Sequence, residues 1–174
     1  MRAVGVRKVT SKLAGSLEPF AEIEAYLIQA KGAPKIGGAV VQHRFQQLSR
    51  SSAAIQAGWF VSRFVNSITR SDVPDPDLYQ LIYSTLTWLD TKTIVKTILC
   101  SFAFKCIRLQ GYEPMQLAPN PAVAKVVSWL VDQSYSEVQK LRLSDDIWRG
   151  LIITMQAWFD DHTTTHVQLE TLLV

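Results

Sequence analysis

The chain has 174 residues, of which 48% are hydrophobic and 19% are charged, and its formal net charge is +3. This length and composition indicate one core, or a small domain packed on a larger one, and argue against disorder. No apolar run approaches the roughly 18 residues of a membrane span and no apolar stretch follows the basic N-terminus, so we expect a cytoplasmic protein.

The positive charge is concentrated at one end of the chain. Residues 1–50 hold eight basic side chains against three acidic ones, which is +5 and leaves −2 for the remainder. Such an asymmetry is typical of a surface that binds a polyanion. A solvated basic loop would give the same count, so charge alone does not decide between the two interpretations.

Residues 2–41 are predicted to form β-strands. Segment 20–28 alternates apolar and polar side chains before it becomes apolar on both faces, as a half-buried strand does, and segment 3–6 is a shorter candidate. Turn-forming residues are expected to break this region into short strands. These residues are Gly32, Pro34 and the pair Gly37-Gly38.

After Arg50 the apolar period changes to three and four residues, which predicts helices. Asp75-Pro76 and Asn120-Pro121 each combine a capping residue with proline at the first helical position. Ser144-Asp145 starts a further helix, and Gly111 suits a left-handed C-terminal cap. The predicted fold class is therefore α+β and mostly α, with five or more helices behind a short β region.

A basic, hydroxyl-rich turn precedes the predicted strand at residue 20. Arg7-Lys8 and Ser11-Lys12 could together donate hydrogen bonds to phosphate oxygens. The order Arg7-Lys8, Ser11-Lys12, Gly15 and Glu18-Pro19-Phe20 resembles the RecO family of recombination mediators. A second stretch supports this resemblance, because 78–89 and 104–114 look like the family's helix pair ending in Gly111-Tyr112-Glu113-Pro114.

The resemblance implies a partial OB-fold region, basic and DNA-binding, at 1–45 and a helical C-terminal domain at 46–174. Family members have further N-terminal residues that supply the first strands of a five-stranded barrel, so the barrel is expected to be incomplete as written. Many members also hold zinc through four cysteines after the Gly-Tyr-x-Pro turn. Residues 115–119 contain none, so we infer the zinc-free branch, with no metal and no cofactor.

The implied function is DNA repair without catalysis. Members of the family bind single-stranded DNA, anneal complementary strands, and assist recombinase loading in the RecF pathway with the partner RecR, displacing single-strand DNA-binding protein. The residues expected to contact DNA share a basic or hydroxyl side chain near the N-terminus. They are Arg2, Arg7, Lys8, Ser11, Lys12, Lys31 and Lys35.

Other interpretations have weaker support from the sequence. A protein-interaction scaffold that has lost DNA binding with the barrel strands is one alternative. A metal-dependent hydrolase is a distant one, because His162, His166 and Glu170 share a helical face but lack the Glu of a His-Glu-x-x-His motif. The pair Trp59-Phe60 beside Arg63 could stack bases, but core packing is favoured because Phe60 belongs to the apolar stripe. No recognised nucleophile or phosphate-loop motif occurs, so no enzymatic activity is expected.

Overall fold

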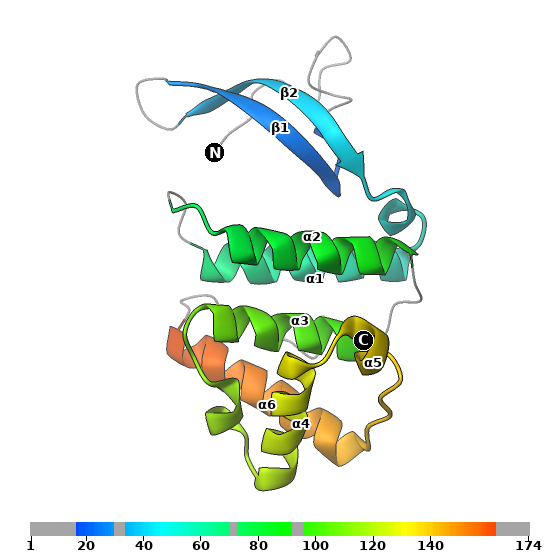
Figure 1. Ribbon diagram of the computed structural model, residues 1–174, viewed down its shortest axis with the longest axis vertical. Helices are drawn as coiled ribbons and strands as arrows, with labels where there is room; N and C mark the ends of the chain where they lie inside the picture. Colours follow the sequence, from blue (N-terminus) through cyan, green and yellow to red (C-terminus); the bar gives the residue numbers. More distant parts are fainter. Residues whose placement is uncertain (1–16, 30–33, 70–72, 92–95, 163–174) are drawn as a thin grey trace.

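The computed structural model describes residues 17–29, 34–69, 73–91 and 96–162. In this part of the chain an antiparallel hairpin of β1 (Ala21–Ile28) and β2 (Lys35–Arg44) arches over a helical body (Figure 1). The body consists of α1 (Ser52–Ile68), α2 (Pro76–Thr91), α3 (Lys96–Leu109), α4 (Pro121–Asp132), α5 (Tyr135–Val138) and α6 (Asp145–His162). Two 3-10 turns, η1 (Gln46–Ser49) and η2 (Pro114–Leu117), join these elements. The predicted α+β, mostly α class is confirmed.

Local capping chemistry sets the helix ends as predicted. The side chain of Asp75 accepts a hydrogen bond from the Leu78 backbone N–H at 2.9 Å, and that of Asn120 accepts one from Val123 N–H at 3.0 Å. Each bond satisfies a backbone donor that has no partner inside its own helix. At the end of α3, Gly111 has φ +85°, a left-handed conformation in which a Cβ would be strained.

Helix α3 is the centre of the body. Figure 1 shows α1 and α2 as a layer between the hairpin and α3, with α4 and α6 beyond α3. Side chains on all sides of α3 are buried, and Phe102 lies with its ring 5.9 Å from that of Phe64 on α1. Phe64 also meets Phe159 of α6 edge to face at 5.1 Å. These aromatic contacts join three helices that are distant in sequence, and such pairs add about 0.5–1.5 kcal/mol each beyond area burial.

A row of polar side chains on α3 attaches it to α4 and α5. Thr97 donates to the Val138 carbonyl at 3.3 Å, Ser101 to that of Leu130 at 2.7 Å, and Lys105 Nζ to that of Gln133 at 2.7 Å. The donors are four residues apart, so they lie on one face of α3. Burial lowers the pKa of Lys105, while the negative end of α4 supplies a favourable acceptor for its ammonium group.

The Gly37-Gly38 pair does not form a turn, so that prediction was wrong. Both residues lie inside β2, a continuous strand of ten residues. A Cβ on Gly37 would stand 2.6 Å from Cγ1 of Ile28, and one on Gly38 would stand 3.4 Å from the Tyr26 ring. The glycines therefore leave room for large side chains on the neighbouring strand, where the register is also irregular.

Candidate nucleic-acid interface

Aromatic packing attaches the hairpin to α1 and α2 at one end. The ring of Phe20 lies edge-on to Trp59 at 5.9 Å and covers Gly58, where an added Cβ would stand 2.7 Å from Cζ of Phe20. Phe20 has φ 58°, and its carbonyl accepts a hydrogen bond from Phe45 N–H at 3.0 Å. A left-handed, non-glycine residue is costly, so these contacts must hold it in place.

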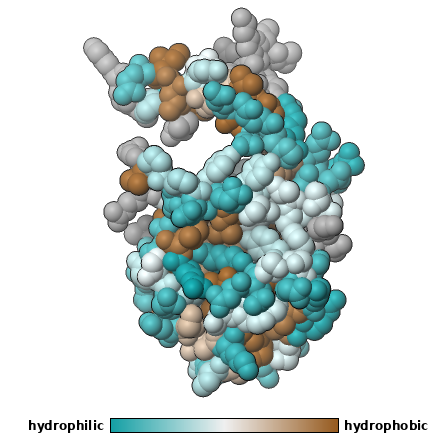
Figure 2. Space-filling model, in the orientation of Figure 1, coloured by the Kyte–Doolittle hydropathy of each residue, from teal (hydrophilic) through white to brown (hydrophobic). Residues whose placement is uncertain are grey.

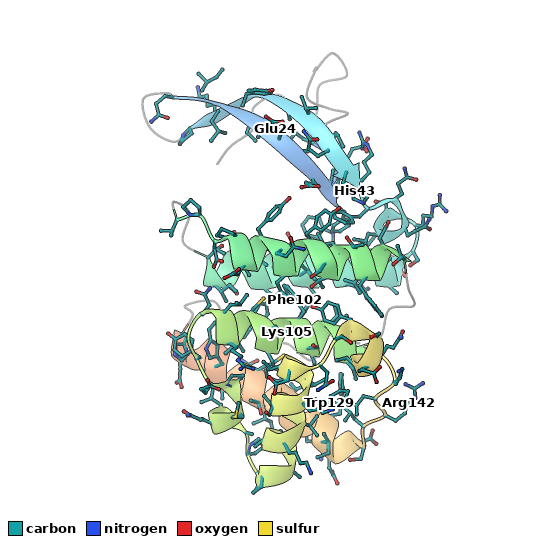
Figure 3. All side chains as sticks on the ribbon, viewed as in Figure 1. Glu24, His43, Phe102, Lys105, Trp129 and Arg142 are labelled. Carbon is teal, nitrogen blue, oxygen red and sulfur yellow. The ribbon has the colours of Figure 1, made fainter. Side chains whose placement is uncertain are left out.

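A second aromatic cluster links β2 to α2. His43 at the end of β2 lies 4.7 Å from the ring of Phe45 and 6.0 Å from that of Tyr83. Tyr83 in turn lies 6.4 Å from Tyr79, one turn earlier on α2, with nearly parallel rings. Figure 3 shows His43 at this attached end of the hairpin and Glu24 farther along it. The cluster runs from a buried ring, Phe45, to a half-exposed one, Tyr79.

The two faces of the hairpin differ in character. The cross-strand partners Ile23 and Val41 are half-buried, as are Ala25 and Ala39. The opposite face points toward α2, because Glu22 accepts a hydrogen bond from the Tyr79 hydroxyl. We call this second face the notch face, since Figure 2 shows an open notch between the hairpin and the body. Its members are Glu22, Glu24, Tyr26, Ile28, Lys35, Val40 and His43.

The notch face offers rings and apolar surface. Tyr26 is 57% exposed, and Tyr79 on the facing helix is 51% exposed. Ile28 and Val40 are also exposed. Planar, solvent-accessible rings of this kind are the platforms on which single-stranded bases stack in proteins that bind nucleic acid without sequence preference.

The charge of the notch face is not positive. Glu22 raises the pKa of Tyr79 through their hydrogen bond, and Glu24 accepts a hydrogen bond from Gln42 at 3.0 Å. The described residues hold eleven Lys and Arg against thirteen Asp and Glu, a formal charge of −2 compared with +3 for the whole chain. The positive excess of the chain therefore comes from residues outside the described part.

Of the residues predicted to contact DNA, Lys35 is exposed at the start of β2, opposite Ile28 on the notch face. The other six lie outside the described residues: Arg2, Arg7, Lys8, Ser11, Lys12 and Lys31. Trp59 is 48% exposed, whereas Phe60 is fully buried as predicted. Tyr79 and Tyr83 were not predicted, although their spacing of four places both rings on one face of α2 beside its apolar stripe, which was a usable signal.

Of the three candidate metal ligands, His162 lies among the described residues. His166 and Glu170 lie outside the described part, and within it no group of three or more His, Cys, Asp or Glu side chains could hold a metal ion. His162 stacks on Trp158 at 5.1 Å, and its Nδ1 is hydrogen-bonded to the Trp158 carbonyl at 2.9 Å. Cys100 and Cys106 are buried free thiols, and burial raises the pKa of both.

The fold and this surface define a mostly helical α+β protein that presents an open aromatic face between a hairpin and a helix pair. No helix among the described residues is long and apolar enough to cross a membrane. Residues 51–116, which include α1, α2 and α3, match the family "Recombination protein O C terminal".

Curated relatives agree with this match. The chain is 27% identical over 113 residues to the DNA repair protein RecO of Myxococcus xanthus, and 28% identical over 112 residues to that of Dehalococcoides mccartyi. Each alignment covers 64% of this chain, and they span 46% and 44% of those proteins, less than half of their length. The RecO of Geobacter sulfurreducens is 28% identical over 88 residues. The predicted resemblance to the RecO family is confirmed, because the chain is similar to these proteins over the aligned residues.

Proposed function

We propose that this chain is a non-enzymatic DNA repair protein of the cytoplasm that binds single-stranded DNA and anneals complementary strands. The similarity to proteins named DNA repair protein RecO is the observation that supports the proposal most directly. By the same resemblance, the chain would assist recombinase loading in the RecF pathway, with RecR and single-strand DNA-binding protein as partners. None of these steps makes or breaks a covalent bond, so a surface that holds strands near one another suffices.

The notch face suggests how the bases are held. Tyr26 belongs to the notch face of the hairpin and Tyr79 to α2, which Glu22 of the same face contacts, so a strand entering the notch would stack bases on both rings. The carboxylates of Glu22 and Glu24 repel phosphates, which favours bases inside the notch and the sugar-phosphate backbone outside. Lys35 lies on the same face at the end of the hairpin where β1 leads into β2, and its ammonium group can meet a phosphate there.

The phosphates require more positive charge than the described residues supply. We propose that Arg2, Arg7, Lys8, Lys12 and Lys31 act with Lys35 as phosphate contacts and that Ser11 donates a hydrogen bond. If about four phosphates are neutralised, the logarithm of affinity should fall with the logarithm of salt with a slope near −3. Base stacking would contribute a part of the binding free energy that does not depend on salt concentration.

The test is a titration of fluorescent oligothymidine at several salt concentrations. Reversing the charge of Arg7, Lys8 and Lys12 together should abolish binding and annealing at unchanged helix content. Tyr79→Ala should weaken binding by about 1–3 kcal/mol, roughly 5- to 150-fold, at every salt concentration. Tyr79→Phe is the matched control, because it keeps the ring and loses only the hydrogen bond to Glu22.

A control away from the notch is Asp160→Asn with Asp161→Asn, which should change neither binding nor annealing. If the charge-reversed chain folds and still anneals, the phosphates are held elsewhere, and the surface of α1 around Trp59 and Arg63 is the next place to examine. Absence of DNA binding at low salt would instead favour a protein-interaction scaffold. The −2 charge of the described residues and the exposed Tyr26, Leu27, Ile28 and Val40 favour that second function.

A further inference from the structure

The hairpin joins the helical body through η1, and a side chain of α2 holds η1. The carboxylate oxygen Oδ1 of Asp90 accepts hydrogen bonds from the backbone N–H groups of Gln47 at 2.5 Å and Leu48 at 3.1 Å. These are the second and third residues of η1, whose N–H groups a capping side chain usually satisfies. Phe45, which stands at the capping position, makes no such side-chain bond. Asp90 therefore caps η1 from 43 and 42 residues away in the sequence.

The place of Asp90 on α2 is unfavourable for α2 itself. Asp90 lies in the last turn of this helix, which ends at Thr91. A carboxylate near the C-terminus of a helix opposes the helix dipole, which favours cations there. Figure 1 shows this end of α2 beside the turn where β2 leads into the body. The contact with η1 thus accounts for a carboxylate at a position where α2 alone would disfavour one.

The direction of the hairpin depends on how η1 is fixed. Leu48 of η1 is fully buried, and Phe45 just before η1 is 3% exposed, so this segment is packed on the body. Phe45 N–H also donates to the Phe20 carbonyl at 3.0 Å, which joins the start of β1 to the end of β2. Farther along the hairpin, Tyr26 and Ile28 are exposed. The far half of the hairpin therefore extends over the notch from a base that η1 anchors.

A small rotation at this base moves the far side chains by several ångströms. Tyr26 pairs with Gly38, which precedes Phe45 by seven residues. At roughly 3.3 Å per residue, this is about 23 Å of strand. A rotation of about 10° at the base would then move Tyr26 by roughly 4 Å, which is about the spacing of stacked bases. Stacking of a base on Tyr26 and on α2 at once is therefore sensitive to the angle of the hairpin.

We propose that Asp90 is a positioning residue for the notch, because its carboxylate fixes η1 and thereby sets the angle of the hairpin over α2. This role of Asp90 rests on the function proposed above, since the angle matters for binding only if the notch holds a strand. Asp90 itself need not touch DNA. Without its carboxylate, two backbone donors of η1 lose their acceptor, so the base of the hairpin is no longer held at one angle.

A distance measurement between nitroxide labels tests the positioning without DNA. Gln29→Cys, just after β1, and Lys125→Cys, on α4, place labels at exposed positions of the hairpin and the body. Cys100 and Cys106 are buried and should stay unlabelled in the folded chain. Asp90→Ala should broaden or shift the distribution of label distances. Asp90→Asn should keep the natural distribution, because it retains an oxygen acceptor for both N–H groups.

Asp77→Ala is the matched control, because it removes the same charge from the exposed first turn of α2, far along the helix from η1. Affinity for oligothymidine should fall at least fivefold in Asp90→Ala and change less than twofold in Asp90→Asn and Asp77→Ala. Circular dichroism and urea unfolding establish that the compared chains are folded. If Asp90→Ala does not fold, Asp90→Glu takes its place, since its carboxylate stands one methylene farther out and should shift the distances.

The positioning role is overturned if the folded Asp90→Ala chain keeps the natural distance distribution, or if it keeps the natural affinity for oligothymidine. It is also overturned if Asp90→Asn changes the distances as much as Asp90→Ala. If the natural chain itself binds no oligothymidine, the proposed function fails, and the distance distributions alone decide whether Asp90 sets the angle of the hairpin.

Discussion

The substitution Gly150→Ala tests the closest approach of α4 and α6. Gly150 is buried on α6, and a Cβ built there would overlap Cγ2 of Val123 and lie 3.3 Å from its Cγ1. Val123 is itself fully buried on α4, and β-branched side chains have one favoured rotamer in a helix. The clash therefore cannot be relieved by turning a flexible side chain.

Gly150→Ala is expected to change the free energy of unfolding in opposite directions in the natural chain and in the Val123→Ala variant. Alanine in a helix is favoured over glycine by about 1 kcal/mol, and overpacking a core costs about 1–3 kcal/mol. Because the overlap is severe, we expect Gly150→Ala to lower the free energy of unfolding by about 1–2 kcal/mol. Val123→Ala alone should cost about 2 kcal/mol as a cavity. In that background both γ-methyl groups are gone, so Gly150→Ala should stabilise the chain by about 1 kcal/mol.

Urea unfolding of the four chains, followed by circular dichroism at 222 nm, measures the coupling between the two sites (roughly 2–3 kcal/mol expected). Equal m-values across the set would show that the comparison is valid. If Gly150→Ala stabilises the natural chain, α4 and α6 are farther apart than the structure places them, and the reasoning fails.

Two further predictions concern α3. Ser101→Ala should lower the free energy of unfolding by about 1–3 kcal/mol, because the Leu130 carbonyl loses its buried donor. Urea unfolding measures this, and an unfolding free energy equal to that of the natural chain would contradict the prediction. Cys100 and Cys106 should not react with Ellman's reagent in the folded chain near neutral pH, and both should react in denaturant. Since burial raises the pKa of both thiols above 9.0, the free energy of unfolding should fall as pH rises past that value. Fast reaction of the native chain with Ellman's reagent would show instead that the thiols are accessible.

Local sequence signals determined the helices. Asp75-Pro76, Asn120-Pro121 and Gly111 each set a helix end through hydrogen bonds within a few residues, so no distant contact was needed to predict them. The four-residue helix α5 was missed, because so short a helix has no apolar period to detect. The division into 1–45 and 46–174 stays a prediction, as does the OB-like character of the β region.

Only the tertiary structure decided the roles of residues whose partners are far away in sequence. Gly37 and Gly38 have the composition of a turn, yet they lie within a strand because Ile28 and Tyr26 occupy the space beside them. Nothing in the sequence indicates that Ser101 is buried and hydrogen-bonded, because its partner Leu130 is 29 residues away.

The candidate site divides in the same way. Composition located a basic N-terminal region, because net charge can be counted without knowing the fold. The hydrogen bond between Tyr79 and Glu22 joins residues 57 apart in the sequence, and no composition count predicts it. Hydrophobic periodicity specifies which face of an element is buried, whereas the choice of partner depends on how whole elements pack, and that information is not local.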